Sequence, residues 1–316
     1  MKDLRGRRAF ITGAAAGIGR AIAAELARQG THLFLVDIDP DGLAETVEEV
    51  RSNGVRVATS VCDLTDADQI TAVCQRVLEE FGGVDLLVNN AGVAFYGPTS
   101  SMTTEQWDWL LAVNLHAPIQ ITRELLPSLL SLQDSHIVNM CSIAGLVAGG
   151  RFAAYHVSKF GLVGFTEALR AEYGRRGLGV TAICPGPVTT KLYESAPAGN
   201  GSKVPTPPRW ACATPEAVAK KTVRAIRRNR RQVLITPMAH GLFALKRIAP
   251  GLLDFINTFS RKRLKAALPW NRSAFVEGRS QGHALSPSVS KSSAATSPAV
   301  VAGRIEPSEI AHGRAA

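Results

Sequence analysis

Short apolar runs alternate with amphipathic stretches along most of the chain, from residue 7 to about residue 190. The apolar runs are rich in β-branched residues, as buried strands are, and the amphipathic stretches repeat their apolar positions at helical spacing. The predicted strands are Arg8–Thr12, His32–Val36, Arg56–Val61, Leu86–Asn89, His136–Cys141, Gly179–Cys184 and, further along, Gln232–Thr236. The predicted helices cover residues 18–29, 40–52, 66–81, 104–131, 152–174 and 215–229.

This regular alternation predicts the fold class. Strands that are joined by crossover helices lie parallel in one sheet, and the helices then cover both of its faces. We therefore expect an α/β, doubly wound (Rossmann-like) catalytic domain over residues 1–240.

Three later segments depart from this rhythm. Residues 191–214 are rich in Pro and Gly, which predicts a long loop that acts as a substrate lid. Residues 241–268 return to helical spacing, so we expect a basic amphipathic helical extension over 241–270. Residues 271–316 are dominated by Ser, Ala, Pro and Gly, a composition that predicts a disordered tail.

The net charge of +10 comes from one segment of the chain. Residues 1–202 carry 16 basic and 21 acidic side chains, whereas residues 203–265 carry 15 basic and two acidic ones. A protein that binds nucleic acid usually spreads its positive charge over the face that meets the phosphates. Because the larger part of this chain is mildly acidic, we do not expect nucleic acid as a partner.

The five cysteines are far apart, odd in number and without a CxxC pair, which indicates reduced thiols. The amino terminus lacks the apolar core of a secretory signal, and no apolar stretch is long enough for a membrane-spanning helix. We therefore expect a cytoplasmic protein. The seven histidines show no metal-ligand spacing, so no metal site is predicted.

A glycine-rich turn, Thr12–Gly19, joins the first predicted strand to the first helix. Glycines let the backbone approach a pyrophosphate closely, and the helix that follows presents unpaired N–H groups. We expect the pyrophosphate of a dinucleotide to bind at Gly13, Gly17, Ile18 and Gly19. A tight strand-to-helix turn without a ligand would have a similar sequence.

Asp37 ends the second predicted strand, where a carboxylate can accept hydrogen bonds from ribose hydroxyls and repel a 2′-phosphate. Ala16 and Ile38 supply no cation for such a phosphate. The sequence therefore favours NAD as the cofactor over NADP, although Arg20 is a nearby cation that leaves NADP open.

Ser142, Tyr155 and Lys159 form the sharpest candidate site. Tyr155 and Lys159 are four residues apart, so on a helix they share one face and the ammonium can lie near the phenol. A free tyrosine has a pKa of about 10, and a nearby positive charge favours the phenolate that can act as a base. Ser142 follows the fifth predicted strand.

With these motifs in order, the chain resembles the short-chain dehydrogenase/reductase family over roughly residues 5–190. The resemblance is carried by Thr12–Gly19, Asp37, Asp63-Leu64, Asn89-Asn90-Ala91-Gly92, Asn114, Ser142, Tyr155–Lys159 and Pro185–Thr190. It implies that the catalytic residues are Asn114, Ser142, Tyr155 and Lys159, with Asn114 supporting a water that relays protons from Lys159. Among the cofactor contacts that it implies are Asp63, Leu64, Asn90, Gly92, Tyr155, Lys159, Pro185, Gly186, Val188 and Thr190. Asn89 would brace the sheet.

Three functions follow as hypotheses. The first is an oxidoreductase that transfers a hydride between NAD and a secondary alcohol or ketone. The second, within the same class, is an NADPH-dependent carbonyl or 3-oxoacyl reductase. The third is a dinucleotide-sensing protein without turnover, which would have no chemical need for all three of Ser142, Tyr155 and Lys159.

The expected partners are a small apolar substrate and further copies of the chain. Leu146, Val147, Phe152, Leu192, Tyr193 and Trp210, with Phe95 and Tyr96 nearby, would line an apolar substrate pocket. His156 is expected to be a packing or surface residue. The resemblance implies a homodimer or homotetramer through helices 104–131 and 152–174. Residues 241–265 border apolar positions with cations, so peripheral membrane contact is a further hypothesis.

Overall fold

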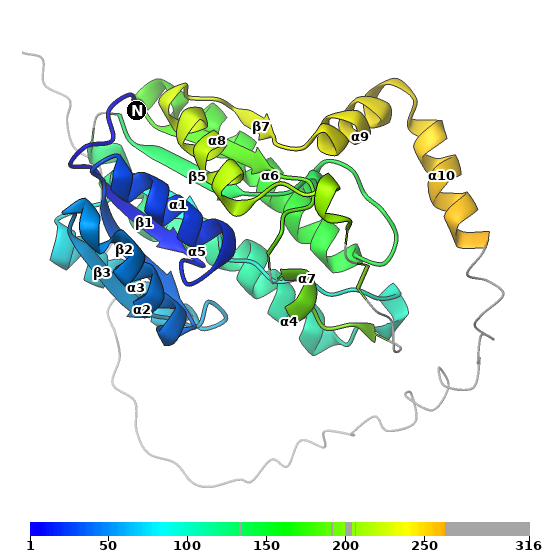
Figure 1. Cartoon of the computed structure of the whole chain (residues 1–316), viewed down its shortest axis with the longest axis horizontal. Helices are drawn as coiled ribbons and strands as arrows, with labels where there is room; N and C mark the ends of the chain where they lie inside the picture. Colours follow the sequence, from blue (N-terminus) through cyan, green and yellow to red (C-terminus); the bar gives the residue numbers. More distant parts are fainter. Residues whose placement is uncertain (133, 191, 200–203, 206, 263–316) are drawn as a thin grey trace, which may run out of the picture. The chain divides into compact units, whose positions relative to one another are not determined.

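Seven parallel strands form one sheet in the computed structural model, in the order β3-β2-β1-β4-β5-β6-β7 (Figure 1). The structure describes residues 1–132, 134–190, 192–199, 204–205 and 207–262. The strands are β1 (Arg8–Thr12), β2 (His32–Asp37), β3 (Val57–Val61), β4 (Leu86–Asn89), β5 (His136–Met140), β6 (Gly179–Cys184) and β7 (Gln232–Leu234). All seven predicted strands are confirmed, three of them with the predicted bounds and the others with one end shifted by one or two residues. The doubly wound fold class is confirmed with them.

The helices and their bounds are α1 (Gly17–Arg28), α2 (Pro40–Val50), α3 (Ala67–Phe81), α4 (Thr104–Leu111), α5 (Ala117–Ser131), α6 (Ala153–Tyr173), α7 (Leu192–Ser195), α8 (Pro215–Arg227), α9 (Pro237–Ile248) and α10 (Pro250–Lys262). Several begin at a residue whose side chain accepts a backbone N–H, as Asp39 does for α2, Asp66 for α3 and Thr214 for α8. Such caps satisfy N–H groups that the first turn of a helix leaves unpaired.

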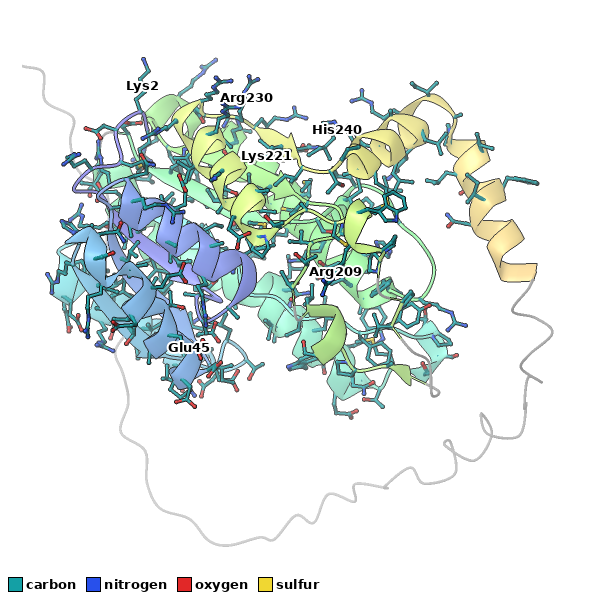
Figure 2. All side chains as sticks on the ribbon, in the orientation of Figure 1. Lys2, Glu45, Arg209, Lys221, Arg230 and His240 are labelled. Carbon is teal, nitrogen blue, oxygen red and sulfur yellow. The ribbon has the colours of Figure 1, made fainter. Side chains whose placement is uncertain are left out.

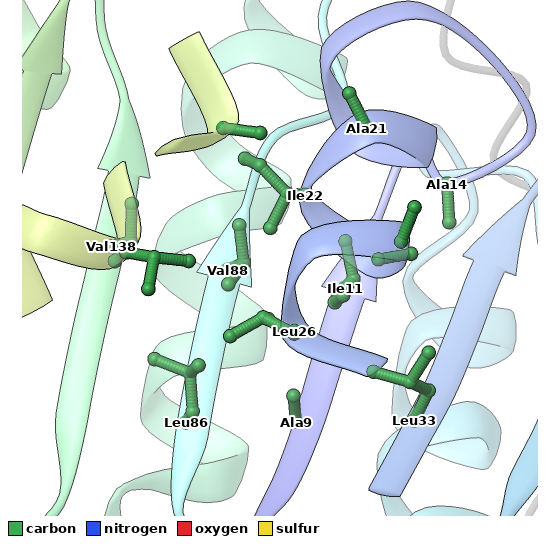
Figure 3. Packing of buried hydrophobic residues seen from close by; sticks show 14 of the residues in the cluster. Ala9, Ile11, Ala14, Ala21, Ile22, Leu26, Leu33, Leu86, Val88 and Val138 are labelled. Atoms are coloured by element: carbon green, nitrogen blue, oxygen red, sulfur yellow. The ribbon is translucent and has the colours of Figure 1, made fainter. Parts of the chain in front are cut away.

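The side chains of each strand divide between two apolar cores, one on each face of the sheet. On β1, Ala9 and Ile11 belong to the core beneath α1 and α8, whereas Phe10 belongs to the core that includes side chains of α3 and α5. Figure 3 shows the first of these cores, with Ile22 and Leu26 of α1 packed over the strands. Since both faces are covered, the carboxyl-terminal ends of the strands are where a ligand can approach the sheet.

The helix predicted over residues 104–131 is interrupted. α4 ends at Leu111, a π-helical turn, η3, covers Ala112–His116, and α5 begins at Ala117. In this turn the N–H of Ala117 donates to the carbonyl of Ala112, five residues back instead of four. The apolar positions keep a helical spacing on either side, so the pattern alone gives no sign of the break.

The carboxyl-terminal part of the described chain differs from the predicted division. α9 begins at Pro237, after a Thr236 side chain that accepts from the N–H of Ala239, so the boundary predicted at residue 240 falls inside this helix. Its described residues, with α10, belong to the same compact unit as the sheet. The predicted lid contains α7 and a 3₁₀ turn at Arg209–Ala211. The predicted tail, 271–316, lies outside the described residues.

Among the described helices, none has both the length and the apolar character that crossing a membrane requires.

Candidate active site

A cavity of about 1070 Å³ lies at the carboxyl-terminal ends of the central strands. It brings together nearly all of the predicted site residues: Gly13, Gly17, Ile18, Asp37, Asp63, Leu64, Asn90, Gly92, Ser142, Tyr155, Lys159, Pro185, Gly186, Val188 and Thr190. Of the predicted set, Gly19 and Asn114 do not line it. The cavity is therefore assembled from segments that span most of the sheet.

The glycine-rich turn leads into α1, and no side chain caps the first N–H groups of this helix. Gly13 and Gly17 have φ angles of 66° and 55°, a region that glycine adopts without strain. The capping residue of α1 is Ala16, which offers no side-chain hydrogen bond, and the first turn of α1 carries no acidic residue. This arrangement fits the pyrophosphate of a dinucleotide.

Gly19 has a different part in this turn. It is buried, and a Cβ at this position would collide with the carbonyl oxygen of Gly13. The side-chain amide of Asn90 donates to the carbonyls of Thr12 (3.0 Å) and Gly13 (3.1 Å) on the same turn. Gly19 and Asn90 thus hold the shape of the turn, and Asn90 also lines the cavity.

Asp37 lies at the end of β2 and already organises the loop around it. Its carboxylate accepts the N–H of Ala15 at 2.9 Å and the N–H of Asp39 at 3.2 Å. Arg20 lies in the same wall of the cavity, but its guanidinium donates to the carbonyls of Ala15 and Gly42 and pairs with Glu45 at 2.8 Å. The guanidinium of Arg20 is therefore already partnered.

Asn89 braces the sheet, as the resemblance implies. Its side chain is buried and donates to Asn139 of β5 at 2.8 Å and to Thr122 of α5 at 3.2 Å. These contacts tie β4 to β5 and to the helix below. At the β3 edge of the sheet, Asp63 accepts from the N–H and the hydroxyl of Thr65 and lines the cavity.

Ser142, Tyr155 and Lys159 meet at the end of β5. Ser142 follows the strand, and its Oγ accepts the N–H of Ala144 at 3.1 Å, which begins a 3₁₀ turn over Ile143–Gly145. Lys159 of α6 is only 3% exposed, and its Nζ donates to the carbonyl of Met140 at 3.0 Å. The Nζ lies 5.6 Å from the centre of the Tyr155 ring. Burial lowers the pKa of Lys159 from its usual value of 10.5.

Asn114 is fully buried in the π-helical turn, and its side chain contacts α6 beside Lys159. Its Oδ1 accepts the N–H of Val93 at 2.8 Å, and its Nδ2 donates to the carbonyl of Val93 and to Ser158 Oγ. A Cβ built on Gly92 would lie 3.3 Å from Asn114 Oδ1 and 3.5 Å from Lys159 Nζ. The backbone at Gly92 thus lies close to both of these side chains.

The residues around the substrate end differ from the expected apolar set. Leu192 lines the cavity as predicted, but Leu146, Val147, Phe152, Phe95 and Tyr96 do not, and Trp210 is 88% exposed. The side chain of Tyr193 lies outside the described part of the structure. Apolar side chains that sequence reasoning missed take their place, namely Val93, Trp109 and Val113. They come from a loop, α4 and η3. Val93 and Val113 each adjoin a motif residue, Gly92 and Asn114, whereas no motif residue adjoins Trp109.

One cation was also missed. Arg209 lines the cavity from the segment between α7 and α8 (Figure 2). Its neighbours in the wall include Pro207 and Cys212. No hydrogen bond or ion pair involves its guanidinium among the described residues.

His156 is a second residue whose part could not be read from the sequence. The N–H of Gly149 donates to its Nε2 at 3.0 Å, which leaves the ring proton on Nδ1, and Nδ1 donates to the carbonyl of Ala144 at 2.8 Å. The ring thereby fastens the loop that follows Ser142 to α6. Burial lowers the pKa of His156, which favours this neutral form.

The part of the chain that the structure describes contains no group of three or more His, Cys, Asp or Glu side chains that could hold a metal ion.

The model of the short chain dehydrogenase family matches residues 7–200 of this chain. The chain belongs to that family. The match extends from β1 through the segment after β6, so it includes every residue of the Ser142, Tyr155 and Lys159 cluster. The family membership makes the protein an oxidoreductase that uses a nicotinamide cofactor, and the cavity has the turn, helix terminus and carboxylate that such a cofactor needs.

Two named relatives illustrate the extent of the similarity. The chain is 36% identical over 199 residues to the "CLA biosynthesis dehydrogenase/reductase" of Lactiplantibacillus plantarum, a match that covers 62% of this chain and 69% of the relative. It is 33% identical over 255 residues to the SadH protein of Mycobacterium tuberculosis, covering 78% and 92% of the two chains.

Solved structures agree with the fold. A short-chain dehydrogenase/reductase from Burkholderia phymatum in complex with NAD superposes with a TM-score of 0.72 at 30% identity, over 80% of this chain and 97% of the other. A metagenomic short-chain oxidoreductase in complex with NADP gives a TM-score of 0.63 at 31% identity, over 74% and 97%. Similar proteins therefore bind either form of the cofactor.

Proposed function

We propose that this protein transfers a hydride between NAD and a secondary alcohol or ketone. The observation that carries the proposal is the single cavity in which Ser142, Tyr155 and Lys159 meet the glycine-rich turn and Asp37. A dinucleotide that binds along this cavity places its reactive ring at the end opposite the Asp37 wall, beside the three polar side chains. The bound nicotinamide supplies the hydride acceptor or donor at its C4 carbon.

In this proposal the chain's own residues handle the proton and the substrate oxygen. Tyr155 takes the hydroxyl proton on its phenolic oxygen during oxidation and returns it during reduction. Ser142 holds the substrate oxygen by a hydrogen bond from Oγ. Lys159, a buried cation beside the Tyr155 ring, favours the phenolate. Asn114 supports the water that passes the proton onward from Lys159.

The choice of NAD over NADP is part of the proposal. A carboxylate at Asp37 accepts hydrogen bonds from ribose hydroxyls and repels a 2′-phosphate, and Arg20 is committed to Glu45 and to two backbone carbonyls. The competing NADPH-dependent reductase would need Arg20 to leave these partners. Pro185, Gly186, Val188 and Thr190 are proposed to hold the nicotinamide end, and Asp63 and Leu64 the adenine end.

The proposed substrate is a predominantly apolar alcohol or ketone. The cavity that contains Ser142 is also lined by apolar side chains, which supports this class: Val93, Trp109, Val113 and Leu192. Arg209 in the same wall adds one place where a negatively charged group of the substrate would be favoured.

Kinetics with both cofactors test the proposal. We expect the protein to turn over members of a panel of secondary alcohols and ketones with NAD or NADH. Turnover with NADP or NADPH should be weak. In Asp37→Ala the preference should fall by at least about tenfold, the value of one charge-assisted hydrogen bond. A strong wild-type preference for NADP would refute the NAD assignment.

Tyr155→Phe separates the enzyme from a non-catalytic dinucleotide sensor. Removal of the phenolic oxygen should abolish turnover while NADH binding, followed by its fluorescence, is retained. If wild-type protein binds NADH but turns over no member of the panel, and Tyr155→Phe changes nothing, the sensor becomes the better description.

We also propose a homodimer in which α6 contacts its copy, with a homotetramer as the alternative. Val157 is 51% and Phe160 37% exposed on α6, and a Cβ at Gly164 would meet open space. These positions leave an apolar and small-residue strip for close helix packing. Sedimentation equilibrium of wild type and Val157→Glu tests it, because a charge in this strip should lower the mass.

A further inference from the structure

An apolar face is left exposed on the last described helices. Ile248, near the end of α9, is 83% exposed, and on α10 Leu252, Phe255 and Ile256 are 50%, 64% and 47% exposed. The three residues of α10 lie at positions i, i+3 and i+4, so they share one side of the helix. α10 packs against α9 and continues from it at the edge of the described chain (Figure 1).

The sequence around this apolar face is rich in cations. The sequence from 246 to 265 contains Lys246, Arg247, Arg261, Lys262, Arg263 and Lys265 against a single acidic residue, Asp254. The side chain of Arg247 is exposed. A helix with an apolar side that is bordered by Lys and Arg lies readily in the interface of an anionic lipid layer, where apolar burial and charge attraction act together.

We propose that the α9–α10 surface, defined by Ile248, Leu252, Phe255 and Ile256 with the exposed Arg247, docks onto an anionic lipid membrane. This goes beyond the proposed function. A second copy of the chain is the less favourable occupant, because two such surfaces would bring like charges together. Negatively charged headgroups complement the same cations.

The α9–α10 surface is attached to the active-site side of the protein. Lys246 Nζ donates to the carbonyl of Leu146 at 2.6 Å and lies 4.8 Å from the centre of the Phe160 ring. Leu146 follows the turn that Ser142 begins, and Phe160 follows Lys159. Docking through α9 and α10 would therefore hold the loop beside Ser142 near the lipid, where an apolar substrate is dissolved.

Vesicle sedimentation of the full chain tests the proposal. Wild-type protein should sediment with vesicles that contain phosphatidylglycerol, and much less with pure phosphatidylcholine. Phe255→Ser with Ile256→Ser should lower the partition coefficient at least about tenfold, because two exposed apolar side chains are removed. Arg247→Gln with Lys262→Gln should lower it for the anionic vesicles and reduce its salt dependence.

The matched control is a second basic cluster, formed by the amino terminus and the segment that follows α8. Lys2, Arg228 and Arg230 border a separate hollow, and Figure 2 shows Lys2 and Arg230 at the same edge. Arg228→Gln with Arg230→Gln removes the same charge as the α9–α10 pair and should leave vesicle binding unchanged. An equal loss in this control would show attraction by net charge alone and overturn the proposal. The proposal also fails if Phe255→Ser with Ile256→Ser binds vesicles as wild type does. It fails as well if wild-type protein does not bind vesicles and the same variant has a lower oligomeric mass, because the surface would then contact a second copy of the chain.

Discussion

His156 gives the sharpest test of how the active site is built. Its imidazole holds the loop after Ser142 at two points, through the carbonyl of Ala144 and the N–H of Gly149. His156→Ala removes both hydrogen bonds. Each is worth about 0.5–1.5 kcal/mol net, so the loop loses about 1–3 kcal/mol of ordering.

That loss predicts a fall in kcat/KM of about 5- to 150-fold, since each 1.36 kcal/mol is a factor of ten. The Kd for NADH should stay near its wild-type value, because the turn at Gly13–Gly19 and Asp37 belong to other elements. Glu172→Ala, an exposed change on the same helix, is the control.

The pH dependence adds an independent readout. Because the folded pKa of His156 lies below its ordinary value of 6.5, the neutral ring and both of its bonds are intact above that pH. As the pH falls from 6.5 through this lowered pKa, protonation of the folded ring removes the acceptor for the N–H of Gly149, and the loop contribution is lost. The difference between wild type and His156→Ala should therefore shrink in acid. A kcat/KM for His156→Ala within twofold of the Glu172→Ala control at neutral pH would refute the reasoning.

Two further predictions concern stability and cofactor binding. His136 is fully buried with Nε2 against Thr181 Oγ1 at 2.8 Å, and burial lowers its pKa to about 3, so the unfolded chain protonates first. The free energy of unfolding, measured in urea, should therefore fall as the pH drops from about 6.5 toward 3. His136→Gln should make this pH dependence flatter. An unchanged pH dependence in the variant would show that other groups dominate it. Gly19→Ala should abolish NADH binding, since its Cβ would meet the Gly13 carbonyl, while Gly164→Ala, which meets open space, should bind as wild type; measurable NADH binding by Gly19→Ala would contradict this.

The sheet could be predicted because a parallel strand buried on both faces is written as a continuous apolar run. Leu86–Asn89 was expected with these bounds and is β4. The same logic located the site, since Asp37 and Ser142 each follow directly on such a run or end it, and the carboxyl ends of parallel strands meet at one edge. Asp37 and Ser142 could therefore be placed without knowledge of any contact, whereas Asp63 and Asn114 were expected only from the family resemblance.

The residues that were missed or misplaced lack a local signal. Trp109 and Arg209 enter the cavity because tertiary packing brings α4 and the segment before α8 to the strand ends. Trp210 was expected in the pocket, yet the 3₁₀ turn at Arg209–Ala211 directs its ring to solvent. The start of α9 did have a signal, because a Thr at the cap followed by Pro at the first helical position is typical of a helix start.

The π-helical turn shows why a correct residue can be predicted without its setting. An α-helix that ran unbroken from 104 to 131 would rotate every residue after Ala112 relative to those before it by a fixed 100° per residue. The extra residue of the π turn changes this phase, and Asn114 thereby faces Val93 and Ser158 while α4 and α5 keep their own apolar sides on the protein. A Cβ at Gly92 would lie 3.3 Å from Asn114 Oδ1 and 3.5 Å from Lys159 Nζ, so the absence of a side chain leaves these two groups room beside the backbone. The direction of the Asn114 side chain thus depends on a backbone irregularity that the 3.6-residue repeat of the sequence does not encode.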